Sequence, residues 1–351
     1  MRYINLCAAL LCAGLIGVAS ASDGRIESTT IHSPALEGNL LGDSPEREIA
    51  VLLPPGYDEQ LERRYPVIYF FPGHYSTYVD ALGYFTFGSR LANDIESGAV
   101  PPVIVVAADG NNKYGACYNN SPVAGHWEDY IAEDLVQYID ANYRTLPQAA
   151  SRGIGGKSAG AQGAMSIALH RPDVFCAVYA MKGYMAYTDK LMNDNMWKVQ
   201  IEAGEEARVG FLLAFLTAFT PNPDSPPLFI DMPYELVGDV VQPLVGVADR
   251  LWAGFPISLL DQYLASGTPL RGIFIETAIN DAAGLGATND AFSDALSAAG
   301  IEHTHMITPG GHGDNPDTAI DLLVPFFVEN LDFGASPTAI ESRSWAQIKS
   351  E

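Results

Sequence analysis

The chain has 351 residues, of which 48% are hydrophobic and 17% are charged, so it is long enough to bury a core and too apolar to be disordered. Its 19 Lys and Arg against 42 Asp and Glu give a formal net charge of −23. A surface this negative repels phosphate backbones and anionic lipids, which argues against nucleic-acid binding.

The first 21 residues have the pattern of an export signal. A basic start at Met1-Arg2 precedes an apolar run over 4–18 and the small residues Ala19-Ser20-Ala21. The run is shorter than the roughly 20 apolar residues that span a bilayer, so we expect no membrane insertion. We therefore expect cleavage before Ser22 and a secreted or periplasmic protein.

From Glu48 onward, short apolar strands alternate with amphipathic helices, which predicts an α/β fold with a mainly parallel sheet. The predicted strands are Ile49–Leu53, Val67–Phe71, Val103–Ala107, Arg152–Gly155, Ala177–Met181, Gly272–Thr277 and His303–Ile307. The predicted helices include Ser89–Ser97, Trp127–Tyr143, Ala159–His170, Thr288–Ala299 and Thr318–Asn330. Thr288 is the expected N-cap of its helix, and Gly300 the residue that closes it.

The expected organisation is a signal over 1–21, one α/β domain over 22–334 and a tail over 335–351. The alternation breaks over 184–270, where an apolar helical run at Phe211–Phe219 is followed by a Pro-rich connector. This insertion is either an extra helical layer packed on the sheet or a cap over a site, since ligands bind at the C-terminal edge of such sheets.

Two cysteines remain after the signal, in a compartment that permits disulfides. The predicted strands place Cys117 and Cys176 at opposite edges of the sheet, about 15 Å or more apart at the rise of a strand. A disulfide needs Cα atoms within about 7 Å. We expect both thiols to be unpaired.

The pentapeptide Gly156-Lys-Ser-Ala-Gly160 lies between a predicted strand and a predicted helix. This context is typical of a nucleophile elbow, in which a strained turn exposes a serine hydroxyl above the sheet. The helix N-terminus adds partial positive charge where an oxyanion would form. The other interpretation is a glycine-rich turn with a capping serine. We favour Ser158 as a nucleophile.

A nucleophilic serine needs a base and an acid, in the chain order Ser, acid, His of an α/β-hydrolase. His312 lies between the last predicted strand and the last predicted helix, which is the position of the base. Asp281 follows the preceding strand and is the expected acid. Its rival Asp290 falls in a helix first turn, where the dipole explains a carboxylate, and Asp314 is too close to His312 in sequence.

An oxyanion hole needs two backbone N–H groups. Ala159, directly after the nucleophile, supplies one, and His74, after the second core strand, the other. The His74 ring could equally line the pocket. We find no His, Cys or carboxylate cluster at zinc or EF-hand spacing, so we expect no metal and no cofactor.

These residues resemble the esterase-D-like family of α/β-hydrolases, which includes feruloyl and enterochelin esterases, S-formylglutathione hydrolases and mycolyltransferases. The matching stretches are Ser33–Leu36, Val51–Tyr57, Tyr65–Gly73, Glu133–Thr145, Gly156–Gly163, Arg171–Phe175 and Gly310–His312. The resemblance implies the α/β-hydrolase fold and the roles assigned above. Pro72-Gly73 departs from the family's His-Gly, Lys157 is an unusual neighbour of the nucleophile, and the Gly often seen near the acid is missing around Ala278.

The expected function is a secreted serine carboxylesterase that acts through an acyl-enzyme on a small-molecule or polymer-linked ester. The apolar run at Phe211–Phe219 suggests a preference for apolar or aromatic acyl groups. An acyltransferase with an alcohol acceptor or a serine peptidase would use the same machinery. A non-catalytic binding protein on a hydrolase scaffold is the alternative from another class.

Overall fold

The structure is a computed structural model that describes residues 24–83, 87–188, 193–203, 210–281, 284–314 and 318–334. The expected signal over 1–21 and the expected tail over 335–351 lie outside the described residues. Among the residues described, no helix is long and apolar enough to cross a membrane.

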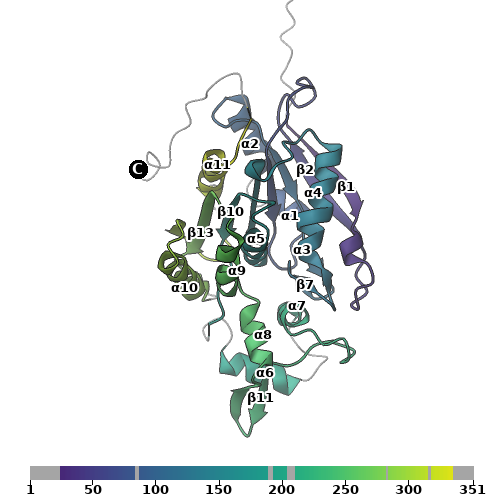
Figure 1. The fold of residues 1–351 in the computed structure, drawn as a ribbon, viewed down its shortest axis with the longest axis vertical. Coiled ribbons are helices and arrows are strands. Elements are labelled where there is room, and N and C mark those ends of the chain that lie inside the picture. The colour runs from purple at the N-terminus through teal and green to yellow at the C-terminus, as the bar shows by residue number, and fades with distance from the viewer. Residues whose placement is uncertain are drawn as a thin grey trace, which may run out of the picture.

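An eight-stranded sheet forms the centre of the molecule, in the order β1-β2-β4-β3-β9-β10-β13-β14 (Figure 1). The first two strands pair antiparallel with their neighbours, and all others run parallel. The strands are β1 (Arg25–His32), β2 (Glu46–Leu53), β3 (Val67–Phe71), β4 (Ile104–Ala107), β9 (Arg152–Lys157), β10 (Ala177–Met181), β13 (Gly272–Ala278) and β14 (Thr304–Thr308). The predicted fold class and all seven predicted strands are confirmed, with small shifts at their ends.

The edge strand β1 was not predicted, and the sheet begins earlier in the chain than expected. Its eight residues pair along their whole length with β2, from Arg25 opposite Leu53 to His32 opposite Glu46. Most of its side chains face solvent, and Ile31 is its single buried residue. A strand that contributes so little to the core lacks the apolar alternation by which strands are recognised.

Helices cover both faces of the sheet, because alternate residues of each strand point to opposite sides. In β3, Val67, Tyr69 and Phe71 join the core on one face, and Ile68 and Phe70 the core on the other. The first face carries α3 (Trp127–Asp129), a π-helical turn over 130–135, α4 (Val136–Asn142), α5 (Ala159–His170), α9 (Leu260–Ser266) and α10 (Leu285–Ala298). The second carries α1 (Tyr78–Gly83), α2 (Phe87–Glu96) and α11 (Thr318–Asn330).

The start of α10 differs from the prediction. The helix begins at Leu285, after Gly284 in the left-handed conformation (φ 71°), so Thr288 lies within it and is not its N-cap. Thr288 is buried and its hydroxyl donates to the carbonyl of Leu285. The polar residue that looked like a cap therefore satisfies a carbonyl inside the helix. Gly300 follows the helix end with φ 72°, as expected.

Residues of the predicted insertion extend beyond one end of the sheet, at the bottom of Figure 1. They form α6 (Asp194–Ala203), α7 (Gly210–Phe219), the hairpin β11 (Tyr234–Val237) and β12 (Val240–Pro243), and α8 (Val247–Ala253). Side chains of α6, α7 and α8 build an apolar cluster of their own, whereas α9 packs on the main core. The segment therefore holds both a separate layer and a piece of the central fold.

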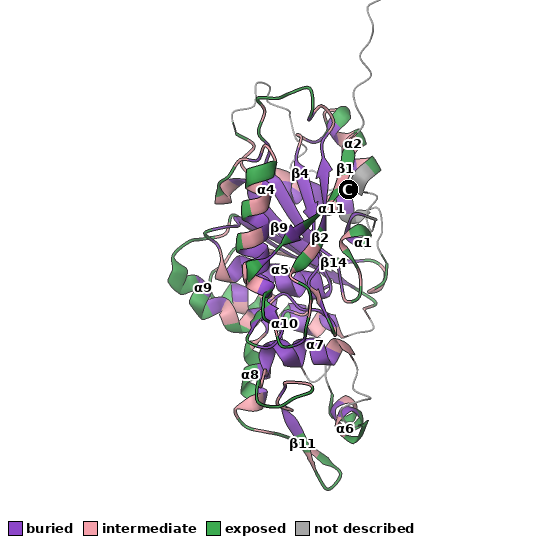
Figure 2. Ribbon diagram, turned by 90° about the vertical axis from the view of Figure 1, so that its right-hand side faces the viewer, coloured by how far each residue is buried: buried purple, intermediate pink, exposed green. Residues whose placement is uncertain are grey.

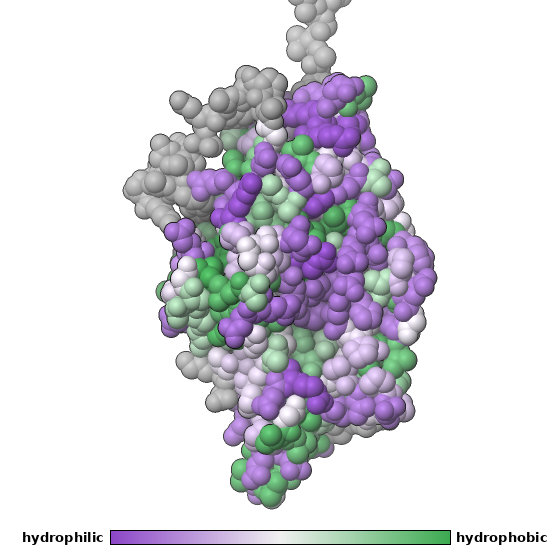
Figure 3. All heavy atoms as spheres, viewed as in Figure 1, coloured by the Kyte–Doolittle hydropathy of each residue, from purple (hydrophilic) through white to green (hydrophobic). Residues whose placement is uncertain are grey.

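The hairpin at the tip of this segment carries exposed apolar side chains. Val237 and Val240 are half or more exposed, and Val245 just after it is 90% exposed. Figure 2 shows the hairpin largely in the colour of exposed residues, and Figure 3 shows hydrophobic surface at this end of an otherwise mostly hydrophilic face.

Both described cysteines are free, as expected. Cys117 is buried in the α7 cluster, and Cys176 packs at the start of β10 with its thiol against the carbonyl of Ala150. Burial raises the pKa of the Cys117 thiol to about 12 and that of Cys176 to about 11. Neither thiol is reactive at neutral pH.

Candidate active site

Ser158 occupies a sharp turn between β9, which ends at Lys157, and α5, which begins at Ala159. Its φ of 57° and ψ of −118° are strained for a residue with a side chain. The flanking glycines make the turn possible: a Cβ on Gly156 would lie 2.5 Å from the backbone of Gly160, and one on Gly160 would lie 2.3 Å from the carbonyl oxygen of Phe71. The predicted strand, turn and helix are all present.

The structure brings the three predicted polar residues into one line of hydrogen bonds. His312 Nε2 lies 3.0 Å from Ser158 Oγ, and His312 Nδ1 lies 2.9 Å from Asp281 Oδ2. The three residues follow β9, β13 and β14, whose C-terminal ends meet at one edge of the sheet. The Asp281 side chain is 2% exposed and Ser158 5%, whereas the imidazole is 32% exposed. Of the three side chains, the imidazole is therefore the one most exposed to solvent.

The two rival carboxylates make other contacts. Asp290 Oδ1 lies 3.9 Å from His305 Nδ1. Because α10 begins at Leu285, Asp290 lies in the middle of this helix and not in its first turn, where it was expected. Asp314 Oδ2 accepts the Gly311 N–H at 2.8 Å and closes the loop that carries His312. The geometry therefore selects Asp281 as the partner of His312.

The two residues predicted to supply oxyanion donors are Ala159, which directly follows Ser158, and His74, which directly follows Gly73. Ala159 is the first residue of α5, and the loop before His74 touches the nucleophile, because a Cβ on Gly73 would lie 3.2 Å from Ser158 Cβ. Within the described part of the chain neither N–H donates to a protein acceptor. Both N–H groups are thus available as donors, as the predicted oxyanion hole requires.

The His74 ring packs on the insertion. It stacks on Phe215 of α7 with centroids 5.9 Å apart and an interplanar angle of 22°, and Phe211 lies at its edge at 6.2 Å. Burial lowers the pKa of the imidazole from its ordinary value. The ring therefore links the loop after β3 to α7, as a neutral aromatic group.

Tyr184 is a site residue that the sequence did not reveal. Its hydroxyl lies 3.4 Å from Ser158 Oγ, and its ring meets Phe215 edge-to-face at 5.7 Å. Burial raises the pKa of its hydroxyl, which stays neutral at physiological pH. A lone tyrosine in an irregular segment carries no motif, and its only signal is its place just past the end of β10.

Lys157, the unusual neighbour of the nucleophile, is buried, with 7% of its surface exposed. Burial, and after it the charge of Lys182, lower the pKa of its ammonium to about 8. The carboxylates of Glu276, Asp314 and Asp281 act in the opposite direction. These lysines and carboxylates form a cluster of positive and negative side chains next to the serine.

Replacing this lysine by methionine should stabilise the fold at neutral pH. The folded pKa of about 8 is below the ordinary 10.5, so between these values the unfolded chain binds the proton more strongly and stability rises with pH. The free-energy cost of burying the charged Lys157 ammonium is therefore fully present below pH 8. We expect Lys157→Met to raise the thermal midpoint at pH 7 by about 2 °C or more, with a gap that narrows towards pH 10.5.

Differential scanning calorimetry at pH 7 and pH 10 measures this gap. Lys198→Met is the matched control, because Lys198 is paired with Asp239 at the surface and its pKa is raised. The control should gain nothing at pH 7. A Lys157→Met protein that melts below the wild type at pH 7 would contradict the argument.

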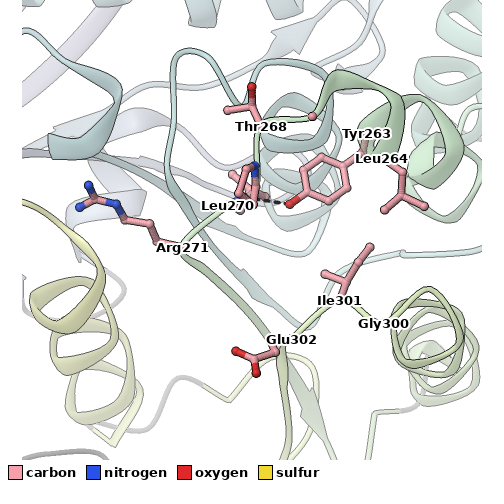
Figure 4. Close-up of a pocket in the computed structure, with 10 residues that line it drawn as sticks. Tyr263, Leu264, Thr268, Leu270, Arg271, Gly300, Ile301 and Glu302 are labelled. Atoms are coloured by element: carbon pink, nitrogen blue, oxygen red, sulfur yellow. Dashed lines mark hydrogen bonds between the residues drawn. The ribbon is translucent and has the colours of Figure 1, made fainter.

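A cavity of about 400 Å³ lies away from this site (Figure 4). Its lining includes Leu270 and Arg271, just before β13, and Gly300 to Glu302, just before β14. It therefore opens at the N-terminal edge of the sheet, opposite the edge that carries Ser158. For metals, the described residues hold no group of three His, Cys, Asp or Glu side chains placed to bind an ion.

Comparisons with known proteins agree with the geometry. Residues 44–211 match the family described as "Putative esterase". Two proteins of Mycobacterium tuberculosis, Esterase MT1326 and Esterase Rv1288, are each 28% identical over 282 residues, which is 77% of this chain and 53% of theirs. The chain thus spans about half the length of the curated relatives it matches.

Solved structures share the fold. A ferulic acid esterase superposes with a TM-score of 0.64 at 18% identity, over 88% of this chain and 99% of its own. An S-formylglutathione hydrolase from Staphylococcus aureus superposes with a TM-score of 0.58 at 16% identity, over 88% and 100%. The predicted resemblance is confirmed: residues 44–211 match the family model of an esterase, and the chain has the fold of ferulic acid esterases and S-formylglutathione hydrolases.

Proposed function

We propose that this protein is a serine carboxylesterase that works through an acyl-enzyme on Ser158. One observation carries the proposal: His312 bridges Ser158 Oγ and Asp281 Oδ2 at hydrogen-bond distance on both sides. The family match over residues 44–211 and the esterase names of the relatives support ester hydrolysis as the reaction.

The reaction follows from the geometry. Ser158 Oγ attacks the ester carbonyl carbon while His312 Nε2 takes the hydroxyl proton, and Asp281 orients the imidazole and stabilises its charged form. The N–H groups of Ala159 and His74 bind the negative oxygen of the tetrahedral intermediate. The imidazolium returns the proton to the leaving alcohol. Water then repeats the sequence on the acyl-enzyme and releases the acid.

The acyl group that fits is apolar or aromatic. The ring of Tyr184, whose hydroxyl lies near the serine, packs against Phe215 with ring centroids 5.7 Å apart. Phe215 in turn contacts both the His74 ring and Phe255. These rings come from the insertion and from the loop that supplies an oxyanion donor. Tyr184, Phe215 and Phe255 thus form an aromatic wall that contacts the acyl group, and α7 serves as a cap on the site.

A series of p-nitrophenyl esters from acetate to palmitate, with a phenylpropanoate included, tests the activity and the acyl preference. We expect turnover by the wild type and a higher kcat/KM for apolar or aromatic acyl groups than for acetate. Phe215→Ala should lower the ratio of kcat/KM for the best apolar or aromatic ester to kcat/KM for the acetate about tenfold, because it removes the ring between Tyr184 and His74. Phe292→Ala, which truncates a buried phenylalanine of α10 outside this aromatic cluster, is the matched control and should leave the ratio unchanged.

Two results would contradict the proposal. A folded wild type that hydrolyses no ester in the series leaves the binding-protein alternative, and a product ester formed with an added alcohol in preference to the acid indicates the acyltransferase. An unchanged ratio in Phe215→Ala removes α7 from the acyl site.

We also infer that the protein is exported after cleavage before Ser22, with the α/β domain ending at 334. The basic start, short apolar run and Ala19-Ser20-Ala21 of the sequence support this inference. N-terminal sequencing of the protein from its native source should begin at Ser22.

A further inference from the structure

Lys182 is a fully buried cation at the C-terminal end of β10, where no motif places it. Its backbone N–H donates to the carbonyl of Glu276 at 2.8 Å, which fixes it between β10 and β13. Its φ of 53° is left-handed, a conformation that is costly for a residue with a side chain. The structure thus holds a charged side chain in a strained position directly beneath the active site.

The ammonium of Lys182 reaches the loop that carries His312. Its Nζ donates to the carbonyl of Gly311 at 3.1 Å and to the carbonyl of Asp314. These two residues are the first and last of a turn, in which the Asp314 N–H donates back to Gly311 O at 3.3 Å. His312 and Gly313 are the two residues between them, so the ammonium ties together both ends of the turn that presents the imidazole.

We propose that Lys182 is a positioning residue for His312, an inference that rests on the proposed function. Charge-assisted hydrogen bonds to two carbonyls are stronger than neutral ones and hold the turn in one geometry. Without the ammonium both carbonyls lose this donor, and the turn can relax. A displacement of the imidazole by about 1 Å is enough to lower the rate by two orders of magnitude.

Lys182→Gly and Lys182→Met test the assignment. Glycine adopts the left-handed φ without strain, so its defect cannot arise from the backbone, and methionine keeps most of the side-chain volume without the charge. In both variants we expect kcat to fall about 10- to 100-fold while KM changes less than about twofold. Lys198→Met, which removes a partly exposed lysine far from the His312 turn in sequence, is the matched control and should keep the wild-type kcat.

Chemical rescue separates positioning from a general structural role. n-Butylammonium has the four carbons and the charge that Lys182→Gly lacks. We expect it to accelerate the inactivation of Lys182→Gly by an alkyl fluorophosphonate at least about tenfold, with saturation, because that reaction needs the Ser158–His312 pair and no water step. The amine should not accelerate inactivation of the wild type or of Lys182→Met, because in both proteins a side chain at residue 182 occupies the space that the amine would take.

The outcomes are distinct. Wild-type kcat in both variants, equal amine effects in all proteins, or circular dichroism that shows both variants unfolded would overturn the positioning role. Ester hydrolysis retained by Ser158→Ala would overturn the proposed function itself. If Ser158→Ala is inactive while Lys182→Gly and Lys182→Met are fully active, only the inference about Lys182 fails.

Discussion

Ser158→Ala is expected to lower kcat for the best p-nitrophenyl ester by at least about 10⁴-fold while the thermal midpoint stays close to that of the wild type. The hydroxyl is the atom that attacks in the proposed mechanism, and its loss leaves only the oxyanion donors and binding to assist water. The alanine removes one oxygen at a 5% exposed position, so the fold has little to lose.

The matched control is Ser166→Ala, a buried serine on α5 whose hydroxyl accepts a hydrogen bond from Gln162. Its kcat should remain within about threefold of the wild type. A Ser158→Ala protein that keeps a tenth of the wild-type activity would remove Ser158 from the mechanism.

Asp281→Asn is expected to have the second largest effect, a fall in kcat of about 10³- to 10⁴-fold with KM little changed. The carboxylate accepts a hydrogen bond from His312 Nδ1 at 2.9 Å and so leaves Nε2 as the atom that accepts the serine proton. An amide can present its NH₂ group to Nδ1 and favour the wrong tautomer.

Asp290→Asn is the control for this variant, because Asp290 is the carboxylate that the sequence offers as a rival. It lies near His305 and contacts no member of the triad, so kcat should stay near the wild-type value. If Asp290→Asn lost activity and Asp281→Asn did not, the assignment of the acid would be reversed.

The central fold could be predicted from the sequence because its strands are apolar on both faces. Val67–Phe71 and Ala177–Met181 are buried at every position, and their predicted bounds agree with the structure. The strand β1 could not be found in the same way, since it is mostly exposed and contributes only Ile31 to the core. Its pairing with β2 is a long-range property that local pattern does not carry.

The predicted site residues could be placed because each follows a predicted strand, and strand ends meet at one edge of a parallel sheet. Ser158, Asp281 and His312 lie together for this reason. Tyr184 and Lys182 were missed because their roles depend on side-chain direction. The phenol hydroxyl of Tyr184 lies near Ser158 Oγ, and the ammonium of Lys182 donates to the loop that carries His312. Neither contact leaves a pattern in the local sequence.

The insertion was the least predictable segment. The apolar run at Phe211–Phe219 indicates a buried helix, and the structure has α7 over nearly the same residues. The partner of that helix could not be read from the run itself, because an apolar helix packs equally well on a sheet or on other helices. The structure shows α7 with its own cluster and with the His74 ring against Phe215.

The covalent intermediate on Ser158 is the most direct test of the central claim. The wild-type protein is mixed with an activated p-nitrophenyl ester, quenched in acid within milliseconds to seconds and digested for mass spectrometry. The account predicts the mass of the acyl group on the peptide that contains Ser158, and none on that peptide from Ser158→Ala. Turnover with no acylated Ser158 peptide at any time, or an acyl group on another residue whose replacement abolishes turnover, would contradict it.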